Sequence, residues 1–344
     1  MMFFNSYIQI SLTRKMLKIP RIRWEEEFKH ILCLNGEDKN NLPQKRIDYI
    51  DLAKGFCILL VVFHHIALLD HDLEYPLKNT MKMFRMPLYF TLSGLFFKNY
   101  AGYFDFAVRK INKLLIPFFA FYIFGVVISD KNGAIWFLFC LFIINMLFYG
   151  LYMLSRMTPS RLQVTFICIS TLISGLTGYF LSIKNITVPL YAGTALTALP
   201  FFAVGFVMRK HTDILKKKHY DSYLWIVSIV LFVVCWLLSG FVHYRTNVYD
   251  IDPFRLYVGG FCGIMGVLFL AKSFVKIPIF SYCGRYSIII LLTHMPILHL
   301  CCHPALKWLV SCGLSHIAAV IVFTLITMLC YVIIIPIVKT YLPH

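Results

Sequence analysis

The segment IDLAKGFCILLVVFHHIALL, residues 50 to 69, is apolar except for Asp51 and Lys54 at its start and His64 and His65 near its end. A helix of about 20 apolar residues crosses the roughly 30 Å hydrocarbon core of a bilayer. The segment therefore predicts a membrane-spanning helix that carries four ionisable side chains.

Similar apolar runs fill the chain on the C-terminal side of this segment. The chain is 59% hydrophobic and 14% charged, whereas a soluble domain has roughly 45 to 50% apolar and about 25% charged residues. This composition excludes a soluble globular protein and indicates an all-α, polytopic membrane protein of about ten transmembrane helices. The predicted spans are 50–69, 81–98, 114–129, 134–154, 163–183, 187–208, 222–242, 254–272, 286–304 and 315–338.

The distribution of positive charge orients these spans. The formal net charge is +17, and most Lys and Arg residues fall in alternate loops, as expected when cytoplasmic loops carry the basic excess. This pattern predicts that both termini lie in the cytoplasm and that the basic excess reflects membrane orientation, with no nucleic-acid partner. We expect a cytoplasmic leader at 1–49, a transmembrane domain at 50–338 and a short cytoplasmic tail at 339–344.

Ionisable side chains inside a span are costly and usually serve a function. Lys54 and His65 are eleven residues apart, which is close to three helical turns, so they share one face about 16 Å apart along the axis. Asp51 lies on the same side as Lys54, whereas His64 points in another direction. A fixed cation suits a phosphate-bearing donor, and an imidazole suits proton removal from a hydroxyl. The alternative is structural: Lys54 extends to the headgroups beside Asp51, and His65 bonds a neighbouring helix.

Two further clusters are candidates for binding or catalysis. Arg109, Lys110 and Lys113 precede the third span, where they form either a phosphate clamp or an ordinary positive-inside anchor. The ninth span contains His294, which is either a second buried base or a hydrogen-bonded packing residue. His299 and His303 are spaced i, i+4, as in some metal sites, but no third ligand has helical spacing with them, so we expect no metal.

Several motifs, taken in order, resemble membrane acyltransferase family 3, the O-acyltransferases of bacterial surface glycans. RIDYIDLAKGFCILLVVFHH resembles the family's first-span signature, in which a basic residue is followed eleven positions later by His. The later blocks that resemble the family are FRMPLYFTLSGLFF, RKINKLLIPFFAFY, WFLFCLFIINML, LPFFAVGFVMRK and GRYSIIILLTHMPI. Two positions depart from the pattern: Lys54 stands where many members have Arg, and Lys110 and Lys113 fill an Arg-x-x-Arg spacing. Lysine keeps the charge but loses bidentate phosphate geometry.

The resemblance implies an O-acetyltransferase of the bacterial inner membrane. It implies acyl-CoA, usually acetyl-CoA, as the donor substrate, with no permanently bound cofactor, and a glycan or glycolipid hydroxyl as acceptor. His65 would be the catalytic base or transient acyl carrier, and Lys54, Arg109, Lys110 and Lys113 would bind acyl-CoA, with Asp51 and His294 in support. Some relatives carry a fused extracytoplasmic domain, so we expect direct transfer or a separate extracytoplasmic partner here.

Two alternatives come from other functional classes. A transporter or flippase of a lipid-linked saccharide would use His65 and His294 as a proton relay, and it would be favoured by inverted repeats with broken helices, which the sequence does not display. A glycan polymerase would be favoured by a large outer loop, and the predicted outer loops are short.

Overall fold

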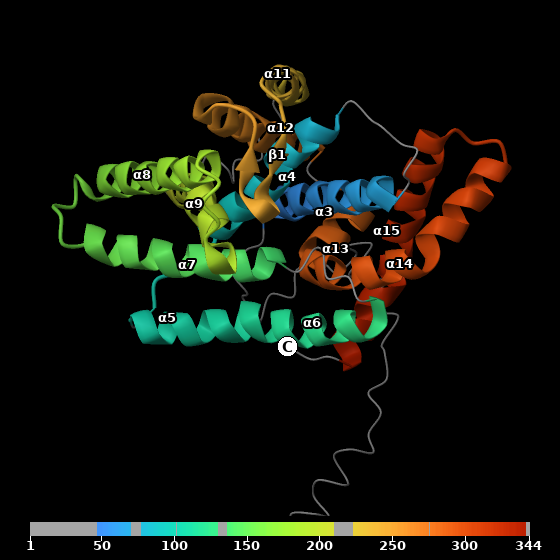
Figure 1. Ribbon diagram of the computed structural model, residues 1–344, viewed down its shortest axis with the longest axis horizontal. Helices are drawn as coiled ribbons and strands as arrows, with labels where there is room; N and C mark the ends of the chain where they lie inside the picture. The colour runs from blue at the N-terminus through green and yellow to red at the C-terminus, as the bar shows by residue number, and fades with distance from the viewer. Residues whose placement is uncertain are drawn as a thin grey trace, which may run out of the picture.

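The computed structural model describes residues 47–69, 77–100, 102–129, 136–209, 223–274 and 276–341. Most of the predicted leader, residues 1–46, and the last residues of the predicted tail, 342–344, lie outside these ranges. The described part is almost entirely helical, as the sequence predicts (Figure 1). Its N-terminal half contains α3 (Asp48–Leu69), α4 (Lys78–Leu95), α5 (Tyr103–Lys110), the π-helical turn η1 (Ile111–Leu115), α6 (Ile116–Ser129), α7 (Trp136–Ser155), α8 (Gln163–Ile183), η2 (Pro189–Tyr191) and α9 (Ala192–Met208).

The C-terminal half begins with α11 and includes a small hairpin. Its elements are α11 (Leu224–Leu237), β1 (Val242–His243), η4 (Tyr244–Thr246), β2 (Val248–Tyr249), η5 (Arg255–Gly259), α12 (Gly260–Phe274), α13 (Pro278–Arg285), α14 (Ser287–Ser311) and α15 (His316–Tyr341). The two strands pair antiparallel, with Val242 opposite Tyr249. The sequence did not predict this hairpin, because its strands are too short to give an alternating pattern, and it did not predict the short helices α5 and α13 between the spans.

Every predicted span contains a helix, but the helices differ in how well they suit a bilayer. Seven helical segments are long and apolar enough to cross a membrane, and they correspond to the first, fourth to sixth and eighth to tenth predicted spans. The other three predicted spans correspond to α4, which carries Lys78, Lys82 and Arg85 in its first half, and to α6 and α11, of 14 residues each. In the ninth span, α14 continues through Pro296 and Pro304 to Ser311, beyond the predicted end at 304.

Helix α3 lies at the centre of the helical assembly. It contacts α4, α12, α13, α14 and α15, and Leu52, Cys57 and Ile58 on it are fully buried. Helices α8, α11 and α15 instead expose rows of large apolar side chains, which suits contact with lipid. The helix that carries Asp51, Lys54, His64 and His65 is therefore surrounded by other helices, as expected where charged groups must avoid hydrocarbon.

The contact between α3 and α13 depends on two glycines. A Cβ added at Gly284 would overlap the carbonyl oxygen of Asp51, and one added at Gly55 would overlap that of Phe280. The two backbones therefore touch directly, as small residues permit in membrane helices. This crossing brings Arg285, at the end of α13, to the start of α3.

Candidate functional site

Two histidines from distant helices meet beside a cavity. The ring centroids of His65 on α3 and His294 on α14 lie 5.2 Å apart, and the ring of His64 lies 5.7 Å from that of His65. His65 is partly exposed, whereas His294 is completely buried. The sequence predicted both residues as candidates and paired them only in the alternative of a transporter relay, because helical spacing does not relate residues of different helices.

The hydrogen bond of His294 defines the state of its imidazole. Its Nδ1 lies 2.8 Å from the carbonyl oxygen of Ile290. A carbonyl only accepts, so Nδ1 carries the proton and donates. Nε2 of His294 is buried and has no hydrogen-bond partner among the residues that the structure describes. In the neutral ring this nitrogen holds the lone pair, so His294 presents an unused proton acceptor next to His65.

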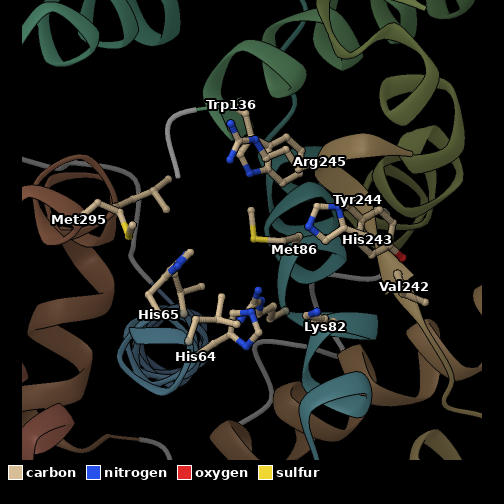
Figure 2. Close-up of a pocket in the computed structure, with 14 residues that line it drawn as sticks. His64, His65, Lys82, Met86, Trp136, Val242, His243, Tyr244, Arg245 and Met295 are labelled. Atoms are coloured by element: carbon tan, nitrogen blue, oxygen red, sulfur yellow. The ribbon is translucent and has the colours of Figure 1, made fainter. Parts of the chain in front are cut away.

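His65 and His64 both line a cavity of about 320 Å³. Its walls come from the C-terminal end of α3, the first half of α4, the start of α7, the β1–η4 hairpin and α14 (Figure 2). In Figure 2, His65 and Met295 lie on one side of this space, with Lys82, His243 and Arg245 across from them. The cavity is large enough for a small-molecule site, for which volumes of roughly 300 to 1,000 Å³ are usual.

A second polar cluster lies at the opposite end of α3. Asp51 Oδ1 is 3.7 Å from Lys54 Nζ, and Asp51 Oδ2 is 3.6 Å from Arg285 Nε. The Lys54 ammonium also lies 4.9 Å from the centre of the Phe96 ring. All three charged side chains are mostly buried, at 13 to 24% exposed. Asp51 thus fixes two cations, where the sequence predicted one.

The basic residues before α6 lie on a distorted helix. Arg109 donates from Nε to both carboxylate oxygens of Asp105, at 3.0 and 3.1 Å, and Lys113 is exposed within the π-helical turn η1. Lys110 Nζ lies 5.2 Å from the ring centre of Phe106. Burial, and secondarily the charge of Lys113, lowers the pKa of Lys110 to about 8.

Aromatic contacts join this basic segment to the Lys54 end of α3. The ring of Phe97 lies 5.7 Å from that of Phe106, and Phe97 follows directly on Phe96, the residue under Lys54. The Arg209 guanidinium donates to the Phe97 carbonyl. Phe96 and Phe97, which follow α4, therefore contact Lys54 and Arg209 directly. Through Phe106 they also lie near Lys110.

The predicted residues thus fall into two groups. His65 and His294 meet beside the cavity, whereas Asp51, Lys54 and the basic segment belong to the other end of α3. Lys54 and Asp51 do not line the His65 cavity. By helical rise, Lys54 and His65 are about 16 Å apart on α3. A substrate that reaches both groups must be elongated.

Sequence reasoning missed several cavity residues: His64, Lys82, Arg85, His243 and Arg245. It also missed Arg285 as the second partner of Asp51. The sequence did contain a signal for Lys82, Arg85 and Arg245, because in the predicted topology they are cations on the outer side, which the positive-inside rule leaves poor in Lys and Arg.

His299 and His303 have the i, i+4 spacing of some metal sites, but within the described residues no third ligand joins them. Among the described residues, no three His, Cys, Asp or Glu side chains come close enough to hold a metal ion. His303 is exposed on α14.

Comparison with known families places most of the chain in one of them. The model of the acyltransferase 3 family, described as an acyltransferase domain, matches residues 47–336. No curated protein and no solved structure matches the chain. The family match covers both polar clusters, the cavity and all the described helices except the end of α15.

Proposed function

This chain belongs to the acyltransferase 3 family, and from that membership we propose that it is a membrane-embedded O-acyltransferase that moves an acetyl group from cytoplasmic acetyl-CoA to a hydroxyl of a cell-envelope glycan or glycolipid. Family membership supplies the reaction class, acyl transfer within a multi-pass membrane protein. The donor, the acetyl group and the acceptor are the proposed parts.

One observation carries the catalytic assignment: His65 lines a cavity, and its ring lies 5.2 Å, between centroids, from that of His294, whose buried Nε2 has no hydrogen-bond partner among the described residues. In the proposed reaction, a ring nitrogen of His65 takes the proton of the acceptor hydroxyl while the oxygen attacks the thioester carbonyl. The carbon–sulfur bond then breaks, and the CoA thiolate takes the proton back from His65. The products are the acetyl ester and CoA, and His65 is regenerated.

His294 supports this cycle as a positioning residue. Its Nδ1–H is committed to the Ile290 carbonyl, so Nε2 faces its surroundings as an acceptor. A lone pair beside His65 stabilises the imidazolium that forms when His65 takes the proton.

The donor fits the opposite end of α3. Lys54, Arg109, Lys110 and Lys113 supply the positive charge that the phosphates of CoA require, and Asp51 holds Lys54 in place. The separation of about 16 Å between Lys54 and His65 suits a long, flexible pantetheine arm. In the proposed topology of ten spans, both termini and this basic end lie in the cytoplasm of a bacterial inner membrane, and the His65 cavity faces outward.

A transporter with a histidine relay is the rival. Contact between His65 and His294 serves a relay as well as it serves a base, so this contact does not separate the two functions. Family membership favours the enzyme.

Proteoliposomes containing the purified protein provide the test. We expect label from acetyl-CoA to appear in an alkali-labile ester on an added envelope glycan, with one CoA released per ester. Saccharide flux without acetyl-CoA, together with no ester formation, would instead establish the transporter.

A further inference from the structure

The cavity that contains His65 has an unusual charge distribution. Lys82, Arg85 and Arg245 line it together with His64, His65 and His243, and no Asp or Glu is among the described residues of its lining. Like charges that share one small cavity repel one another unless an opposite charge lies close to them. The concentration of positive charge at one small cavity therefore needs an explanation beyond membrane orientation.

Two of these cations have no acidic partner within the described part of the chain. Neither Lys82 nor Arg245 forms an ion pair there. Lys82 makes one ring contact, with its Nζ 5.7 Å from the centre of Phe241. Arg255, on η5, differs from them, because its Nε and Nη2 donate to the carbonyls of Leu238 and Ser239 at 3.2 and 2.8 Å. Arg255 therefore stabilises the backbone at the end of α11, whereas Lys82 and Arg245 line the cavity.

The hairpin that carries Arg245 is fixed against the helices. The Tyr244 hydroxyl donates to the Met83 carbonyl on α4 at 3.4 Å, and the Thr194 hydroxyl on α9 donates to the Tyr244 carbonyl at 2.5 Å. Asn247, at the turn, donates from Nδ2 to the Gly178 carbonyl on α8 at 3.0 Å. The backbone at Arg245 is therefore held in place beside the cavity, as expected of a binding group.

The electrostatic state of His243 agrees with a positive cavity. Burial, followed by the charges of Lys82, Arg245 and Arg85, lowers the pKa of His243. Its Nδ1 lies 2.6 Å from the Thr246 hydroxyl oxygen. The cations around His243 thus create a positive local potential, and such a potential favours an anionic ligand in the cavity.

We propose that the cavity is the acceptor site and selects an anionic acceptor, with Lys82 and Arg245 binding a carboxylate or phosphate next to the hydroxyl that His65 deprotonates. This inference rests on the proposed function and specifies its substrate class. A uronic or similar sugar acid supplies the carboxylate, and a sugar phosphate or a lipid-linked sugar supplies the phosphate. Arginine binds either group through paired N–H donors, and lysine binds either as a point charge. Figure 2 shows both cations across the cavity from His65.

Equilibrium binding of three probes to the full chain in lipid nanodiscs tests the anion site without requiring turnover. The probes are methyl glucuronide, glucose 1-phosphate and the neutral methyl glucoside. We expect at least one anionic probe to bind at least about tenfold more tightly than the glucoside, the usual effect of a charged hydrogen bond. Tighter binding of the glucuronide identifies a sugar acid as acceptor, and tighter binding of the phosphate identifies a phosphorylated sugar.

Charge-matched variants decide whether the cavity is responsible. The double variant Lys82→Gln/Arg245→Gln should lose the preference for the anionic probe. The control Lys184→Gln/Lys307→Gln removes the same charge from exposed positions outside the cavity and should retain the preference. Equal binding of all three probes, no binding of any, or an unchanged preference in the cavity variant would overturn the proposal.

Acetyl transfer is measured separately on the same preparations. If the unmodified protein forms the ester but shows no preference for an anionic probe, the anionic acceptor class is refuted and the acyltransferase assignment stands. An anion preference without ester formation under any condition refutes the enzyme and leaves an anion-binding cavity.

Discussion

The imidazole of His294 lies 5.2 Å, between ring centroids, from that of His65, with its Nδ1–H turned away to the Ile290 carbonyl and its Nε2 buried. This arrangement gives His65 a proton-accepting neighbour that is already fixed in one tautomer. His294 is therefore more than a packing residue in the proposed reaction.

Replacement of His294 by Ala should lower kcat by about 10- to 100-fold, because an interaction made with charged His65 disappears. The KM for acetyl-CoA should stay within about twofold, because His294 is far from the basic residues. The pH profile of kcat should shift as well, which a purely structural role would not cause. An unchanged kcat would remove His294 from the catalytic machinery.

Replacement of Gly284 by Ala should destabilise the protein strongly, because the new Cβ overlaps the backbone of α3 at Asp51. We expect a loss of roughly 2 kcal/mol or more, as for other overpacked contacts. Thermal unfolding in detergent measures this effect. Gly150→Ala on α7 is the matched control, since a Cβ there meets nothing within 4 Å, and it should leave the unfolding temperature unchanged or raise it. Equal unfolding temperatures for the two variants would contradict the close crossing.

Donor binding should depend on pH through Lys110. Its pKa is lowered to about 8, mainly by burial, so the side chain is charged below that pH and neutral above it. The affinity for CoA should therefore fall as pH rises through 8. The Lys110→Arg variant keeps its charge throughout and should lose this dependence, whereas Lys113→Gln should move the midpoint upward. The dissociation constant of CoA, measured by calorimetry from pH 6 to 10, checks all three. A flat profile in the unmodified protein would exclude Lys110 from phosphate binding.

The sequence predicted most of the fold because span length and apolarity are local properties. Each of the ten predicted spans contains a helix, including the span at α4 despite its Lys82 and Arg85, whereas the short helices α5 and α13 lie outside the predicted spans. It placed the end of the ninth span at 304, but α14 continues past Pro296 and Pro304 to Ser311. Neighbouring helices can compensate for the lost hydrogen bond, and a single sequence does not reveal those neighbours.

The site was less accessible to sequence reasoning because its geometry is tertiary. Helical spacing placed Asp51, Lys54 and His65 on α3, and the ion pair between Asp51 and Lys54 agrees with it. Helical spacing cannot bring His294 to His65, or Arg285 to Asp51, because these contacts join different helices. Arg245 lies on a hairpin with no sequence signature, so its place in the cavity emerges only from the fold.

The release of CoA from acetyl-CoA by the His65→Ala variant, in lipid and with acceptor present, decides whether His65 is the catalytic base. His303→Ala is the control, because His303 is exposed on α14 outside the cavity. We predict that His65→Ala inserts and folds normally but releases CoA at least about 100-fold more slowly than the control, the usual contribution of a general base. A folded His65→Ala variant that turns over at the rate of His303→Ala would contradict the account.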